Sequence, residues 1–167
     1  MMIVAILAAI AVPSFRYVTT SNRMATELDA LVGDMQYARS EAVRQGEAVT
    51  VCVAASVTSP YSCAVAGTDT WQNGWLVFTD LKSDQTVDAG DAVLRVQKAF
   101  TQGDTLTSSD NISSVTFNRD GFAYTGQAQV TVTLKDSTND TGFTRCLYLS
   151  QSGMMSTAMN ATDATCK

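Results

Sequence analysis

Apolar residues recur at helical spacing along the first 45 positions of the chain. Successive members are alternately four and three residues apart, and they are Met24, Leu28, Leu31, Met35, Ala38 and Ala42. This spacing predicts one apolar stripe on a helix, and Gly46 is a typical helix stop. We expect the stripe to pack against the protein's own sheet. The charged residues beside it are expected to face solvent; they are Arg23, Glu27, Asp29, Asp34, Arg39, Glu41 and Arg44.

The helix begins with a segment that is apolar on every side, residues 1–12, followed by Pro13. As a helix this segment spans about 18 Å, which is short of the bilayer core of about 30 Å. It also lacks the basic stretch that begins a secretory signal peptide. By itself it is therefore neither a complete span nor a complete signal. The helical pattern resumes beyond Pro13, which we expect to kink the helix.

Beyond Gly46 the pattern changes to that of β-strands. The residues 129–134 alternate cleanly, with Val130, Val132 and Leu134 on one face. Turn sequences separate the strand-like runs, and no helical pattern lies between them, so the sheet is expected to be mostly antiparallel. The runs are 48–55, 75–79, 92–99, 114–118, 129–134 and 144–150.

These patterns predict an α+β fold in two parts. Residues 1–46 form the long helix, whose lower part, 21–46, packs on the head. Residues 47–167 form an antiparallel β head. The length of 167 residues suits one core rather than two.

The chain has four cysteines, Cys52, Cys63, Cys146 and Cys166, and no histidine. None of the spacings suits a zinc site or a redox motif. Two structural disulfides in an oxidising compartment are favoured, with Cys52 joined to Cys63 and Cys146 to Cys166. Each would contribute about 3 kcal/mol. The alternative is four buried, reduced thiols.

Charge and chemistry exclude several classes of function. The formal net charge is −5, which disfavours nucleic acid or anionic lipid as a partner. Without histidine, no Ser-His-Asp or Cys-His catalytic arrangement is possible. The acidic loop 80–91 has Lys82 and Gln85 where a calcium loop needs an oxygen ligand and a glycine. We expect no enzyme activity, no cofactor and no metal.

Several motifs together resemble one family. AAIAVPSF is similar to the middle of a type IV pilin N-terminal helix, and the others resemble the FimT/FimU-type minor pilins and the H-type pseudopilins of type II secretion. The motifs are AAIAVPSF at 8–15, MQYARSEAV at 35–43, GWLVFTD at 74–80, DAGD at 88–91 and FNRDG at 117–121.

The resemblance implies that residues 1–20 belong to the membrane and to the fibre core. The core residues would be Ile3, Val4, Ile6, Leu7, Ile10 and Val12. Family members carry a basic leader, which a prepilin peptidase removes, before a Phe-Thr-Leu-Ile-Glu-Leu-like segment. We expect both to precede Met1, which then lies several residues into the mature helix.

By the same resemblance, the helix binds other minor pilins and the major pilin in a tip complex that initiates pilus assembly. Before assembly the protein would be a single-pass protein of the bacterial inner membrane, with its head in the periplasm. Afterwards it would lie in the fibre at the cell surface. Motility, adhesion or DNA uptake would follow from the fibre.

Three alternatives remain at this point. Some FimT-like relatives bind DNA through a Gly-Arg-x-Arg motif, but the matching residues here are Gly153-Met154-Met155-Ser156, so DNA binding is not carried over. An H-type pseudopilin would have the same fold and anchor. A secreted adhesive or ligand-binding β-domain would function as a free monomer.

Overall fold

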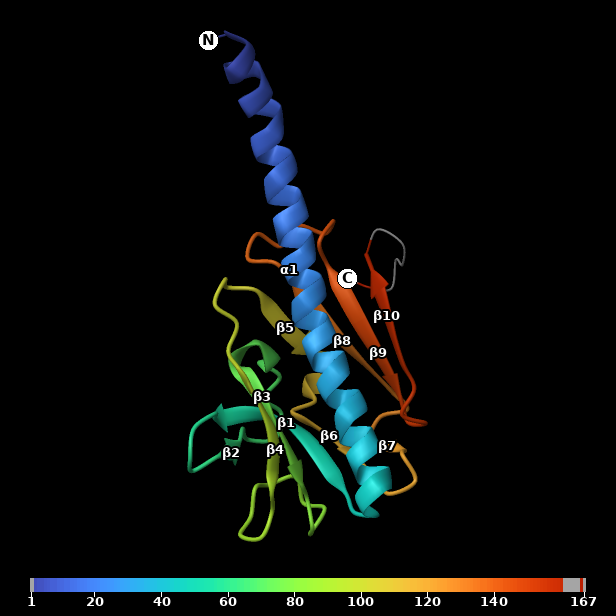
Figure 1. Ribbon diagram of the computed structural model, residues 1–167. Helices are drawn as coiled ribbons and strands as arrows, with labels where there is room; N and C mark the ends of the chain where they lie inside the picture. The colour runs from blue at the N-terminus through green and yellow to red at the C-terminus, as the bar shows by residue number, and fades with distance from the viewer. Residues whose placement is uncertain (1, 161–165, 167) are drawn as a thin grey trace.

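One long helix lies beside two antiparallel sheets in the computed structural model of the protein (Figure 1). The structure describes the backbone of residues 2–160 and 166, and the side chains of residues 15–160 and 166. The helix, α1, runs over Met2–Gln45. Its upper part extends beyond the head, and its lower part lies along the strands.

The end of α1 has a local cause. The Gly46 backbone N–H donates to the Ala42 carbonyl at 2.9 Å, and Gly46 has a φ of +72°, a conformation that glycine adopts without strain. At the other end, the side chains of Ile3, Val4, Ile6, Leu7, Ile10, Val12 and Pro13 lie outside the described residues. The helix passes position 13 without a break, and the kink stays a prediction. Within the described part of the chain, no helix is long and apolar enough to cross a membrane.

The described strands form two sheets. The first has the order β4-β3-β1-β6-β7 with β2 paired to β1, and the second has the order β10-β9-β8-β5. All their pairings are antiparallel, as expected. The first sheet contains β1 (Val49–Ser56), β2 (Ser62–Cys63), β3 (Gly74–Thr79), β4 (Val93–Lys98), β6 (Ser114–Phe117) and β7 (Ala123–Tyr124). The second contains β5 (Thr105–Ser108), β8 (Gln129–Lys135), β9 (Arg145–Ser150) and β10 (Met155–Met159). Short 3₁₀ turns lie at Trp71–Asn73 and Ser109–Asn111.

The sequence predicted β1, β3, β4, β6, β8 and β9 and missed the other strands. β2 and β7 have two residues each, too few for a period of two to emerge. β5 has the polar sequence Thr-Leu-Thr-Ser and buries only Leu106, so it has no apolar alternation. The division into two sheets was also not predicted, because strand patterns do not indicate which strands pair.

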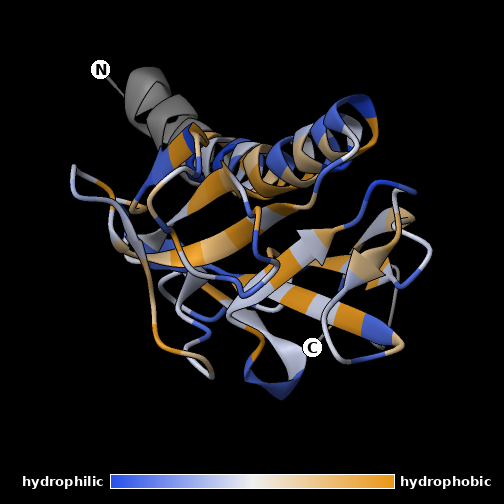
Figure 2. Ribbon diagram, turned by 90° about the horizontal axis from the view of Figure 1, so that it is seen from below, coloured by the Kyte–Doolittle hydropathy of each residue, from blue (hydrophilic) through white to orange (hydrophobic). Residues whose placement is uncertain are grey.

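The apolar stripe of α1 faces both sheets. Its members from Met24 to Ala42 are buried and share one core with residues of both sheets, among them Val51, Trp75 and Leu147. Seen from below, α1 lies over the strands, whose apolar and polar residues alternate (Figure 2). Burying a side chain such as leucine stabilises the fold by about 1.5–3 kcal/mol. The packing of this stripe is therefore the main contribution to the stability of the contact between α1 and the head.

The described residues include two disulfides that close local loops. Cys52 of β1 is joined to Cys63 of β2, with Cα atoms 5.7 Å apart. Cys146 of β9 is joined to Cys166 near the C-terminus, with Cα atoms 5.6 Å apart. The first disulfide joins the two strands of the β1–β2 hairpin, the second joins Cys166 to β9, and no cysteine is free.

Candidate assembly surface

Polar side chains of α1 add specific contacts to the apolar stripe. The Asp34 carboxylate accepts hydrogen bonds from Trp75 Nε1 of β3 at 2.9 Å and from Arg95 Nη1 of β4 at 2.8 Å. The Arg95 guanidinium also lies 3.8 Å from the centre of the Tyr37 ring. One carboxylate thus joins α1 to two strands of the first sheet.

A second polar contact lies near the point where α1 leaves the head. Arg23 donates from Nε and Nη2 to the two oxygens of Asp104, at 2.8 and 2.9 Å. Asp104 is buried just before β5 and also accepts from the Ser137 backbone N–H at 3.1 Å. This paired geometry orients as well as attracts.

Glu27 lies one turn after Arg23 and faces the same buried Asp104. The pKa of Glu27 is raised to about 7, chiefly by burial. The neighbouring charge of Asp104 and a hydrogen bond to Asp104 also raise this pKa, whereas the positive charge of Arg23 lowers it. The Glu27 Oε2 atom is buried and has no hydrogen-bond partner among the described residues. When Glu27 is protonated, its carboxyl group can donate a hydrogen bond to Asp104. This contact between α1 and the head therefore depends on pH.

The second sheet is joined to α1 at two places. Near the top of the head, Arg145 of β9 donates from Nη2 to the carbonyl and the hydroxyl of Ser21, both at 3.1 Å. Near the bottom, Arg39 donates to the carbonyls of Gly121, Gly153 and Ser152 at 2.9, 3.0 and 3.1 Å. Arg39 therefore links α1 to the turns that follow β6 and β9.

The contacts between α1 and the head together form what we call the joint. Exposed apolar side chains gather at both of its ends. Where α1 leaves the head, Phe15, Tyr17 and Val18 are 71%, 57% and 51% exposed, and we call these three residues the neck patch. The Tyr17 ring lies beside the Phe143 ring of the head, with ring centroids 5.1 Å apart. Large exposed apolar patches often mark interaction sites, and Phe15 and Val18, three residues apart, lie on the same side of the helix.

The distal patch lies at the other end of the head, around Arg39. It comprises the exposed residues Val43, Phe122 and Met154. The patch is drawn together by the turns that Arg39 holds, since Phe122 follows Gly121 and Met154 follows Gly153. The head thus presents apolar surface at both ends.

The structure places the predicted residues as follows. Met24, Leu28, Leu31 and Met35 are buried against the sheets, and the four cysteines form the two pairs given above. The expectation that the charged residues of α1 face solvent is wrong for Asp34, which is buried. It is also wrong for Arg23, Glu27, Arg39 and Glu41, which are partly buried. Asp34, Arg23, Glu27 and Arg39 interact with residues far away in the sequence, and no local pattern of residues indicates such contacts.

In the acidic loop 80–91, which was considered as a calcium site, the first carboxylate accepts hydrogen bonds from the protein itself. The buried Asp80 carboxylate accepts from the Thr50 hydroxyl and from the backbone N–H groups of Asp84 and Gln85. Among the described residues, no three acidic, cysteine or histidine side chains form a metal-binding group.

A comparison with protein families shows the family to which the chain belongs. The model of the family described as "Type II transport protein GspH" matches residues 27–153, which cover the lower half of α1 and the head as far as the turn after β9. The chain belongs to the GspH family. No curated protein matches it.

Solved structures agree with this assignment. The type IV minor pilin FimU of Pseudomonas aeruginosa superposes with a TM-score of 0.63 at 23% identity, covering 89% of this chain and 95% of FimU. A second crystal form of FimU gives 0.60 at 25% identity, over 84% and 94% of the two chains. The minor pseudopilin EpsH of the Vibrio cholerae type 2 secretion system gives 0.56 at 8% identity, over 81% and 95%. The chain thus belongs to the GspH family and has the pilin fold that FimU and EpsH share.

Proposed function

We propose that this protein is a minor pilin that joins other pilins through α1, in the complex that begins assembly of a type IV pilus. The observation that carries the proposal is the neck patch. It places exposed aromatic and aliphatic side chains at the point where α1 leaves the head. In a bundle of such helices these side chains become buried against neighbouring subunits.

The rest of the helix supports the same role. Residues 1–12 are wholly apolar, and a segment of this kind suits either lipid or the centre of a helical bundle. We propose that it holds the subunit in the inner membrane before assembly and in the fibre core afterwards, with the head on the periplasmic side. The two disulfides fit an oxidising compartment. A prepilin peptidase would process the precursor, as the family resemblance implies.

The polar network of the joint serves structure rather than catalysis. Asp34, Arg39 and Asp104 use their polar atoms in bonds between α1 and the head. The role of the protein is therefore to present a rigid head at a fixed orientation to α1, so that a neighbour that grips the helix also meets the head.

The neck patch gives the test. In a strain that lacks this gene, the full-length gene carrying Phe15→Glu and Val18→Glu should fail to restore surface pili, because charges would be buried between subunits. Asn22→Glu is the matched control, an added charge on an exposed position of the same helix that should restore pili. Restoration of pili by the double variant, at normal protein levels, would contradict the proposal.

A second candidate is an H-type pseudopilin of a type II secretion system. The description of the matching family and the similarity to EpsH favour it. The same variants distinguish the two roles, since the double substitution should then abolish protein secretion and leave pili unchanged.

A further inference from the structure

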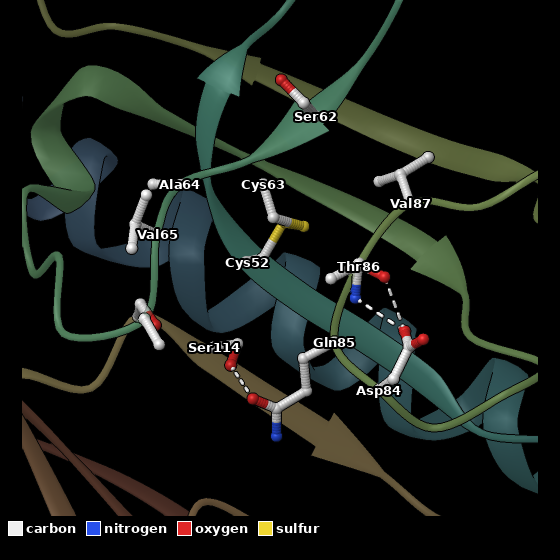
Figure 3. A pocket seen from close by; sticks show the side chains of 12 residues that line it. Cys52, Ser62, Cys63, Ala64, Val65, Asp84, Gln85, Thr86, Val87 and Ser114 are labelled. Carbon is white, nitrogen blue, oxygen red and sulfur yellow. Dashed lines mark hydrogen bonds between the residues drawn. A yellow bond between two sulfur atoms is a disulfide. The ribbon is translucent and has the colours of Figure 1, made fainter.

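A cavity of about 310 Å³ opens on the face of the first sheet that is turned away from α1 (Figure 3). Val51 and Val53 of β1 point into the core beneath α1, whereas Cys52 between them points to the opposite face. The Cys52–Cys63 disulfide lines the cavity, together with residues 62–66 after the β1–β2 turn and residues 84–87 of the β3–β4 loop. The assembly surface described above does not use this site.

The polar groups around the cavity are uncharged except for one carboxylate. Gln85 accepts from the Ser114 hydroxyl at 2.6 Å through Oε1, and no described residue accepts from its Nε2. The Asp84 carboxylate accepts from the N–H and hydroxyl of Thr86 at 3.1 and 2.7 Å, and these bonds lower its pKa. Ser62 adds a further hydroxyl. The site therefore offers both hydrogen-bond donors and acceptors.

The loop that carries these groups is fixed in advance. Asp80 is buried and accepts from the backbone N–H groups of Asp84 at 3.1 Å and Gln85 at 2.9 Å. It also accepts from the Thr50 hydroxyl of β1 at 2.8 Å. Gln85 is held at a φ of +66°, a conformation that glutamine seldom adopts, and its side chain reaches Ser114. A site ordered before binding loses less entropy when a ligand arrives.

We propose that this cavity binds an uncharged sugar ring of a glycan. Each sugar hydroxyl both donates and accepts, which matches the Gln85 amide, the Asp84 carboxylate and the Ser62 hydroxyl. The C–H face of the ring would lie on the disulfide, Ala64 and Val87. The volume lies at the lower end of the range for small-molecule sites, which suits one or two rings.

Other ligand classes fit less well. An anion would find no lysine or arginine among the residues that line the cavity. The nearby Lys82 is already paired with Asp88 at 2.6 Å. A purely apolar ligand would leave the Gln85 amide and the serine hydroxyls without partners, at a cost in free energy.

The test uses the full chain in a detergent without a sugar headgroup. A glycan array should give binding to neutral glycans, and saturation-transfer NMR with the corresponding free sugar should give signals from its ring protons. Gln85→Asn keeps a residue that tolerates the left-handed conformation but is too short to reach Ser114, and it should weaken binding at least tenfold. Ala64→Phe should block the cavity and abolish binding.

Gln127→Ala is the matched control, an exposed amide elsewhere on the head, and it should bind as the parent does. Variants that keep the parent's melting temperature but bind unchanged would overturn the proposal, as would the absence of binding to any neutral glycan. Gln85→Asn should still restore pili in the gene-deletion strain. Its failure there would count against the separation of the cavity from assembly and would leave the neck-patch test unaffected.

Discussion

Charged side chains beside the apolar stripe fix where α1 sits on the head. Apolar packing alone tolerates small slides and rotations, because its contacts are not directional. The bonds from Asp34 to Trp75 and Arg95, and from Arg23 to Asp104, have defined geometry. A helix shifted by one residue would break them and leave buried charges without partners, which is costly.

Asp34→Ala should lower the free energy of unfolding by about 2–3 kcal/mol, because Trp75 Nε1 loses its acceptor in a buried site and Arg95 its ion-pair partner. Asp29→Ala, at an exposed position of the same helix, is the control and should change it by less than about 0.5 kcal/mol. Urea denaturation measures both. Equal effects of the two substitutions would show that Asp34 does not anchor the helix.

Glu27 makes the stability of the joint depend on pH. Its pKa is raised in the fold from 4.5 to about 7, so the folded protein retains a proton that the unfolded chain releases above pH 4.5. The contribution of this group is therefore fully present below about pH 4.5 and is lost as the pH rises to about 7. Glu27→Gln, which keeps a donor for Asp104 at every pH, removes this dependence.

The measurement is the difference in unfolding free energy between Glu27→Gln and the parent from pH 4.5 to pH 7.5. We expect the variant to gain stability relative to the parent across this range. A difference that stays constant with pH would mean that Glu27 titrates normally in the fold.

At the level of elements, the sequence predicts those parts whose signal is periodic. The stripe of α1, its end at Gly46 and the alternation of β8 follow directly from the order of residues. The short strands β2 and β7 and the polar strand β5 do not, because they exist through pairing with longer neighbours. The bonds of Arg39 and Asp104 span 82 and 81 residues, and no local pattern encodes them.

The turn between β9 and β10 shows how one residue supports two elements. Gly153 has a φ of +73°, and an added Cβ would lie too close to the Gly121 carbonyl that Arg39 holds. Gly153→Ala should therefore cost about 2–3 kcal/mol of stability, from strain and the displaced Arg39. Gly126→Ala has a similar φ of +79° but open space around it, so it isolates the backbone cost of about 1 kcal/mol. Equal losses in thermal or urea denaturation would contradict this account of the turn.

At the level of the whole molecule, the two apolar patches lie at opposite ends of the head and differ in their residues. The neck patch lies where α1 leaves the head, and the distal patch lies around the last turn of the same helix. Contacts between unlike surfaces of successive subunits can extend a helical fibre when the rotation between subunits does not close a ring. In the proposed role, the protein would act through the position of these two surfaces.

The most direct test of this account is a cross-link from the neck patch in living cells. A photoreactive amino acid in place of Val18 should capture another pilin subunit when pili assemble, and mass spectrometry of the adduct should identify it. The same residue in place of Tyr61, which is exposed on the head away from α1, should not give this adduct. A Val18 probe that captures no pilin in cells that are assembling pili would contradict the claim that α1 joins the protein to its neighbours.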